Sequence, residues 1–168
     1  VPAERIALYQ PSADSRHPLA TVRVTNDSSA GLPPGVVTLY EVSAASGGET
    51  FVGDARLGTL PAGDERLVSF ALDQRTLVDR EDKYAETIGK LRIDRGVLYT
   101  TLVQRQTTLY AVAAPDGEAL QALIEHPRQP GWELVTPAGE IETTASDYRL
   151  PLTVPAGQTA TLEVVLEL

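Results

Sequence analysis

The residues closest to a catalytic arrangement are Glu125-His126-Pro127-Arg128, where an acid, an imidazole and a guanidinium lie within four positions. A carboxylate and an imidazole could share general acid/base work on one substrate. On a strand, however, consecutive side chains point to opposite faces, so Glu125 and His126 would be separated. The following Pro127, Pro130 and Gly131 favour a strand end, with His126 packed beside Trp132.

Other chemistry-bearing residues lack the surroundings that their chemistry needs. Ser46 lies in Ala45-Ser46-Gly47-Gly48, which is typical of a hairpin tip and not of the strand-turn-helix elbow of a nucleophilic serine. Paired acids could serve glycoside hydrolysis. The closest pairs, Asp64-Glu65 and Glu81-Asp82, lack the pattern of an ion-wrapping loop, so they indicate a solvated acidic surface.

Metal, phosphate and glycan signals are equally sparse. The chain has no Cys and only two His, His17 and His126, far apart in the sequence. Neither Gly-rich phosphate loop occurs. Asn26-Asp27-Ser28 is formally a glycosylation acceptor, but it favours a turn between strands. We therefore predict no catalytic residue, no metal site and no cofactor site.

Composition restricts the partners. The 168 residues carry 14 basic and 23 acidic side chains, a formal charge of −9, which has the wrong sign for binding nucleic acid or an anionic membrane. Because no apolar run approaches 18 residues, we expect no membrane insertion. The chain contains no Met and begins without the pattern of a signal peptide, so we expect a fragment of a longer protein.

The elements that would position these residues are strands. Thirteen Gly and twelve Pro are scattered along the chain and leave little room for long helices. Between them, apolar and polar residues alternate, as in half-buried strands. This pattern predicts an all-β fold of immunoglobulin-like β-sandwich units with little helix. Pro151 indicates an edge strand or a bulge. The five clearest faces are Val36/Thr38/Tyr40/Val42, Val68/Phe70/Leu72, Thr108/Tyr110/Val112, Tyr148/Leu150/Leu152/Val154 and Leu162/Val164/Leu166/Leu168.

Two segments are ambiguous. Residues 73–90 are charged, and Leu77, Tyr84 and Ile88 have roughly helical spacing, so either a short helix or an exposed hairpin arm is open. Residues 118–125 have good helix propensity. Their bracketing turns and the alternation of Leu120, Ala122 and Ile124 favour a strand instead.

The domain prediction is two packed units, residues 1–96, with a charged arm at about 73–90, and residues 97–168. A repeated Pro-Ala-Gly turn before a strand, at 61–63 and 155–157, suggests related units or a common turn solution. One continuous sandwich with an inserted arm is the alternative if residues 75–96 are extended.

Aromatic residues could belong to a core or to a binding face. Trp132, the only Trp, and Leu134 fall on one side of an expected strand, which predicts that the indole points into the core. Exposure of Tyr9, Tyr40, Tyr99 and Tyr148 side by side would favour a binding face.

Four segments resemble a known family: LPPGVVTLYE at 32–41, GTLPAGDERLVSF at 58–70, LIEHPRQPGWEL at 123–134 and YRLPLTVPAGQTATLEV at 148–164. The chain resembles the C-terminal domain of unknown function of mucoidy-inhibitor-A-like bacterial proteins. The resemblance implies a β-rich module preceded in the parent by another β-domain and a coiled coil. It implies no enzymatic activity, no cofactor and no catalytic residue.

The resulting functional hypothesis is a non-catalytic interaction or assembly module in a larger, periplasmic or cell-surface bacterial protein. Its expected partners are the missing N-terminal region of the same polypeptide, another protein or an envelope glycan. A spacer that packs against that N-terminal region is a structural variant. The alternative is a hydrolase acting on an envelope polymer, which needs a cleft that brings His126 within about 3 Å of a proton-transfer partner or substrate.

Overall fold

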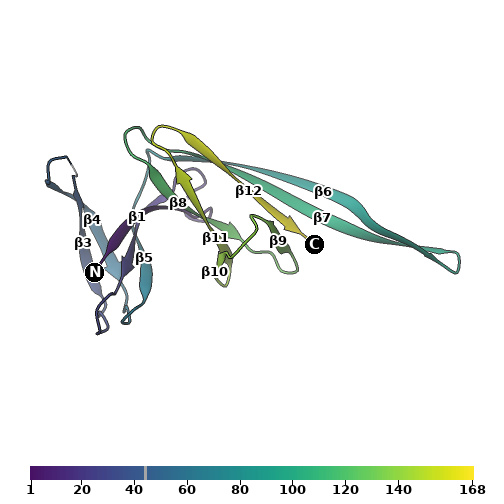
Figure 1. Cartoon of the computed structure of the whole chain (residues 1–168), viewed down its shortest axis with the longest axis horizontal. Helices are drawn as coiled ribbons and strands as arrows, with labels where there is room; N and C mark the ends of the chain where they lie inside the picture. Colours follow the sequence, from purple (N-terminus) through teal and green to yellow (C-terminus); the bar gives the residue numbers. More distant parts are fainter. Residues whose placement is uncertain (44) are drawn as a thin grey trace.

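The chain folds into strands and turns. A computed structural model describes residues 1–43 and 45–168. Strands make up 64% of the protein and pack in a sandwich-like arrangement, with no helix among the described residues, which confirms the all-β prediction (Figure 1). The strands are β1 (Ala3–Tyr9), β2 (Leu19–Thr25), β3 (Gly35–Val42), β4 (Glu49–Leu57), β5 (Glu65–Leu72), β6 (Leu77–Asp94), β7 (Val97–Ala113), β8 (Leu120–Pro127), β9 (Glu133–Thr136), β10 (Glu142–Thr143), β11 (Asp147–Val154) and β12 (Thr159–Glu167).

Three sheets organise these strands. A six-stranded sheet has the order β10-β11-β8-β1-β2-β5, a four-stranded sheet has the order β6-β7-β12-β9, and β3 and β4 form a hairpin. Most neighbours are antiparallel, but β1 runs parallel to β8, with Ala7 opposite Ala122. The N-terminal strand therefore lies in the middle of the largest sheet.

Two main groups of buried side chains hold the sheets together. The smaller lies where the β3–β4 hairpin covers β2 and β5, and is built from Val24, Ala55, Leu57, Leu60 and Val68. The larger lies between the four-stranded sheet and β1, β8 and β11. Its buried members are Tyr9, Val78, Tyr110, Val112, Ala122, Ile124, Tyr148, Leu150, Val154, Val164 and Leu166.

The predicted boundary between residues 96 and 97 falls in the turn that joins β6 to β7. These strands pair with each other from Leu77 opposite Ala113 to Asp94 opposite Val97. Strand pairing also crosses the predicted boundary, because β1 pairs with β8. Tyr9 and Val78, from the predicted first unit, pack in the larger core with side chains of the second. The smaller core uses residues 24–68, whereas the larger core combines Tyr9 of β1 with residues from Val78 onward, and strands of one continuous sheet line both cores.

Several local predictions can be compared with the strands. Residues 120–127 form β8, as the alternation of Leu120, Ala122 and Ile124 indicated. Pro151 lies on β11 beyond the two residues of β10, on an otherwise open edge, as expected for a proline. The residues predicted to share one face of β3 do share it, but that face is exposed at Val36, Tyr40 and Val42, whereas Val37 and Leu39 on the other face pack on the core. Between Leu39 and Tyr40 the pairing with β4 shifts register.

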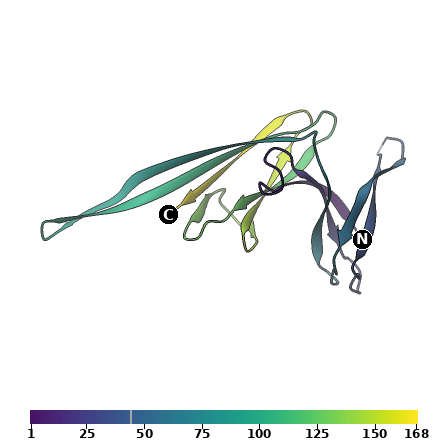
Figure 2. The same cartoon turned by 180° about the vertical axis from the view of Figure 1, so that it is seen from behind.

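The helix considered for residues 73–90 is wrong, and the hairpin arm is confirmed. β6 and β7 form one long antiparallel hairpin. Arg95 and Gly96 make its turn with positive φ at both positions, the backbone of a type I′ turn. Figures 1 and 2 show the hairpin extending as a two-stranded ribbon past the C-terminus, away from the β3–β4 end of the molecule. We call residues 84–104 the arm.

Candidate functional surfaces

His126 is part of the larger core rather than of a surface cleft. It is only 1% exposed, and its Nδ1 lies 2.7 Å from the hydroxyl of Tyr110. The Nε2 atom is buried without a hydrogen-bond partner among the described residues. Burial lowers the pKa of His126 to about 4, assisted by the charge of Arg80. At neutral pH the ring is therefore uncharged, and a substrate has no path to it.

Glu125 lies on the opposite face of β8, as the strand geometry predicted. Its two carboxylate oxygens accept hydrogen bonds from Arg149 Nε at 3.0 Å and from Gln10 Nε2 at 2.8 Å. This carboxylate thus joins β11, β8 and the end of β1. Because Glu125 and His126 are engaged on different faces, the geometry does not favour the hydrolase hypothesis.

A polar group lies on the inner face of β6 and β7 near His126. Asp82 accepts hydrogen bonds from Thr108 at 2.6 Å and from Arg80 at 3.1 Å. Desolvation alone would raise the pKa of Asp82, but these hydrogen bonds hold it below its ordinary value. The carboxylate is consequently a charged structural partner, not a proton donor.

The remaining candidates from the sequence are dispersed. Ser46 is exposed at the tip of the β3–β4 hairpin. Asn26 is fully buried, and its amide donates to the carbonyl oxygens of Ala30, Leu60 and Pro61 at 2.8 to 3.1 Å. This Asn therefore holds a turn together. Across residues 1–43 and 45–168, no group of three His, Asp or Glu side chains is placed to hold a metal ion.

The aromatic residues do not gather into one binding face. Tyr9 and Tyr148 are buried, whereas Tyr40 is exposed on β3 and Tyr99 on the arm. Trp132 is half-buried, because it packs against the larger core and also lines a hollow of about 430 Å³ with Tyr84 at the base of the arm. The indole of Trp132 therefore contacts the core, as predicted, but only part of its surface is buried.

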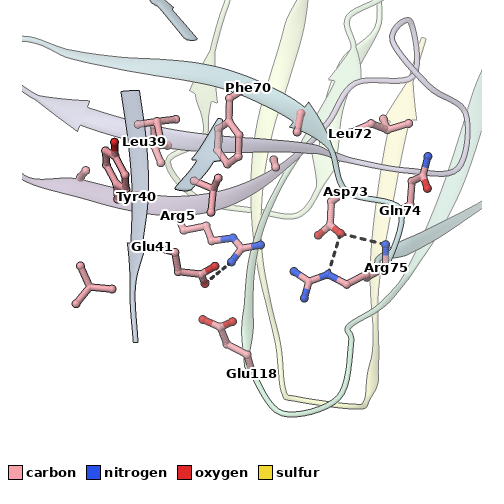
Figure 3. A pocket seen from close by; sticks show the side chains of 16 residues that line it. Arg5, Leu39, Tyr40, Glu41, Phe70, Leu72, Asp73, Gln74, Arg75 and Glu118 are labelled. Atoms are coloured by element: carbon pink, nitrogen blue, oxygen red, sulfur yellow. Dashed lines mark hydrogen bonds and ion pairs between the residues drawn. The ribbon is translucent and has the colours of Figure 1, made fainter. Parts of the chain in front are cut away.

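An open groove of about 700 Å³ lies where β3 passes over β1, β2 and β5 (Figure 3). Tyr40, Phe70 and Leu72 give its walls an apolar character. Arg5 Nη1 and Glu41 Oε1, 2.8 Å apart, connect the sheet to β3.

Charges inside this groove are largely matched. Asp73, buried at its side, accepts hydrogen bonds from the backbone N–H of Arg75 and from the hydroxyl of Thr76, so it holds the turn before β6. Glu118 lies at the opening (Figure 3). Arg5 pairs with Glu41 and Arg75 with Asp73, so Glu118 leaves one carboxylate in excess among the lining residues.

The arm carries the largest set of exposed apolar side chains. Residues opposite one another in an antiparallel pair share a face. Ile88 pairs with Leu102 and Ile93 with Leu98, and these pairs lie on the face that begins in the core with Val78 opposite Val112. The apolar face of the arm consists of Tyr84, Ile88, Leu91, Ile93, Leu98 and Leu102, which are 48 to 76% exposed.

A bulge keeps these residues on one face. Ile88 lies opposite Leu102 and Lys90 opposite Thr101, so Gly89 is the extra residue. Without an extra residue, side chains three positions apart, such as Ile88 and Leu91, would point to opposite faces.

The opposite face of the arm is more polar. Within the arm it carries Lys90, Arg92 and Asp94, each on the other side of the strand from the apolar set, together with the exposed Val97 and Tyr99 near the tip. Arg92 contacts Asp94 at 2.9 Å and lies over the ring of Tyr99. The arm is therefore amphipathic, with an inner face that continues the core outward and an outer face that carries most of the arm's charges.

Sequence reasoning missed this surface for an identifiable reason. The predicted arm ended at Lys90. The bulge at Gly89 interrupts the alternation of apolar and polar residues there, so neither a strand period nor a helix period continues across it. A usable signal was Arg95-Gly96 between the alternating runs Leu91/Ile93 and Val97-Leu98.

Comparison with known proteins adds no relative to this description: no family model, curated protein or solved structure matches the chain. Among the described residues, no helix is long and apolar enough to cross a membrane.

Proposed function

We propose that this chain is a non-catalytic interaction or assembly module. The observation that supports the proposal is the apolar face of the arm, which is exposed on a ribbon that contributes nothing to the larger core beyond its base. Exposed contiguous apolar surface on this scale marks interaction sites in soluble proteins.

The arrangement around His126 supports the same choice over the hydrolase. General acid/base catalysis needs a group within hydrogen-bond reach of a substrate. His126 is enclosed and Glu125 is held by Arg149 and Gln10 on the other face.

The proposed setting is a larger bacterial protein of the periplasm or cell surface. The resemblance to mucoidy-inhibitor-A-like proteins and a composition without Cys, which suits an oxidising compartment as well as a reducing one, support this setting. Fractionation of the parent protein into the cytosol would contradict it.

The experiment is a capture assay with envelope glycans, envelope proteins and a differently tagged copy of the chain as separate probes. We expect the unmodified chain to retain a partner and Ile93→Asp to lose it, because a charge is placed on the apolar face. Thr101→Asp, which adds the same charge on the opposite face, is the matched control. Absence of any partner, or equal capture by Ile93→Asp, would contradict the proposal.

A further inference from the structure

We propose that the occupant of the arm's apolar face is the same face of a second copy of this chain. This inference rests on the proposed function and names its partner. Six large side chains, each exposed by half to three quarters, leave several hundred Å² of apolar surface. That is the scale of the roughly 800 Å² that each partner buries in a standard interface.

The shape of the surface matches its own copy. A two-stranded ribbon offers two adjacent rows of side chains, Ile88, Leu91 and Ile93 on β6 and Leu98 and Leu102 on β7. Two such faces can stack as sheets do, about 10 Å apart, with their side chains interdigitated. Identical patches related by a twofold axis form a closed, isologous dimer.

The position of the sandwich fixes the direction of the two arms. β1, β8 and β11 pack on the same side of the four-stranded sheet as the apolar face of the arm. Arms running in the same direction would force the two sandwiches into one another. Arms running in opposite directions place each sandwich beyond the tip of the other arm.

A twofold axis across the arms at Leu91 gives a consistent register. It lays β6 over β6 of the second copy and β7 over β7 of the second copy. Ile88 then meets Ile93 of the second copy, and Leu102 meets Leu98 of the second copy, because the pairs 88/102 and 93/98 are equally spaced from Leu91 opposite Thr100.

Charges at the ends of the face agree with this register. Glu86, the only charged residue on the apolar face of the arm, is exposed near the base. Arg95 is exposed in the turn at the tip and makes no ion pair among the described residues. In the antiparallel dimer, Glu86 of each chain reaches Arg95 of the other, beside the hollow that Trp132 lines.

The first test is sedimentation velocity over a concentration series. We expect a reversible dimer at micromolar concentration. Leu91→Asp sets two carboxylates against each other on the axis and should raise the dissociation constant by about 100-fold. Thr101→Asp, on the opposite face, should leave the constant within about threefold of the parent value. Circular dichroism verifies that each variant keeps its strands.

The second test is a charge exchange. Glu86→Arg and Arg95→Glu should each weaken the dimer, and the double variant should restore it, because the pair is rebuilt across the interface. Failure of the double variant to recover would overturn the antiparallel register. A chain that stays monomeric at about 100 μM, well above the micromolar range in which we expect the dimer, or a dimer unaffected by Leu91→Asp, would overturn the inference. If that monomer still captures another partner through its arm, the proposed function stands without self-association.

Discussion

At the scale of single residues, buried His126 makes stability depend on pH in a definite direction. In the folded protein its pKa is lowered to about 4 by burial, whereas an unfolded His titrates near 6.5. Between these values the unfolded state binds more protons. The contribution of uncharged His126 to the free energy of unfolding is therefore complete above about pH 6.5. It is lost as the pH drops toward 4, by about 3 kcal/mol in total. Urea unfolding at stepped pH values measures this loss.

His126→Gln is the control for this dependence. The variant should be less stable at pH 7, because Tyr110 changes its hydrogen-bond partner, but its stability should vary much less between pH 6.5 and 4.5. An unchanged pH dependence in His126→Gln would assign the effect to other groups.

Trp132 provides a second residue-scale prediction. Its half-buried indole should emit at a wavelength between those of buried and hydrated Trp and shift to the red on unfolding. Trp132→Ala should cost about 2 kcal/mol, less than the 3 to 5 kcal/mol typical of a fully buried aromatic. Because Trp132 is the only Trp, the fluorescence signal has a single source. Trp132→Phe should keep most of the stability, and an emission maximum already at the hydrated value would contradict the packing.

Some residue-level features followed from the sequence and some did not. Strand geometry alone separated Glu125 from His126. The three carbonyl partners of Asn26 could not be predicted, because they come from two loops that only the tertiary fold brings together.

At the scale of elements, the bulge at Gly89 controls which way the arm's side chains point. A Cβ at position 89 would lie 2.8 Å from Val103 Cγ2, closer than such atoms approach. Gly89→Ala should therefore loosen the arm, and amide exchange at residues 97–103 should accelerate by about tenfold, which corresponds to roughly 1 kcal/mol.

The matched variant adds the Cβ at position 89 and also removes the Val103 methyl group that it would meet. Gly89→Ala combined with Val103→Ala should return amide exchange toward the parent rates, since the crowded methyl is gone. Acceleration of the same size in both variants would show that the backbone of the bulge, and not Val103, excludes a side chain.

Alternation predicted these strands, but it predicted the buried face for only some of them. β11 and β12 kept the predicted faces because their pairing with β8 and β7 is unbroken. β3 alternates regularly, but apolar residues lie on both of its faces, and the core takes Val37 and Leu39 rather than Val36 and Tyr40. Which apolar face of such a strand is covered depends on the sheet it packs against, and alternation alone does not show it.

At the scale of the whole molecule, the sandwich and the arm should be separable. Replacing residues 85–105 by Asn-Gly would close β6 and β7 with a short type I′ turn between Tyr84 and Gln106. Neither main core contains a buried residue from the removed segment, so the free energy of unfolding should stay within about 1 kcal/mol of the parent value. Urea titration measures stability, and sedimentation shows whether association is lost. An unfolded product would show that the arm is required by the sandwich.

The long-range pairing of β1 with β8 has a consequence for the timing of folding. Ala7, Leu8 and Tyr9 find their parallel partners only at Ala122, Leu123 and Ile124. During synthesis from the N-terminus, one edge of β1 stays open until about three quarters of these 168 residues have been made, and open strand edges recruit other chains. Pairing between such distant segments also slows folding. The newly made N-terminal half therefore depends on the last third of its own polypeptide to protect it from aggregation.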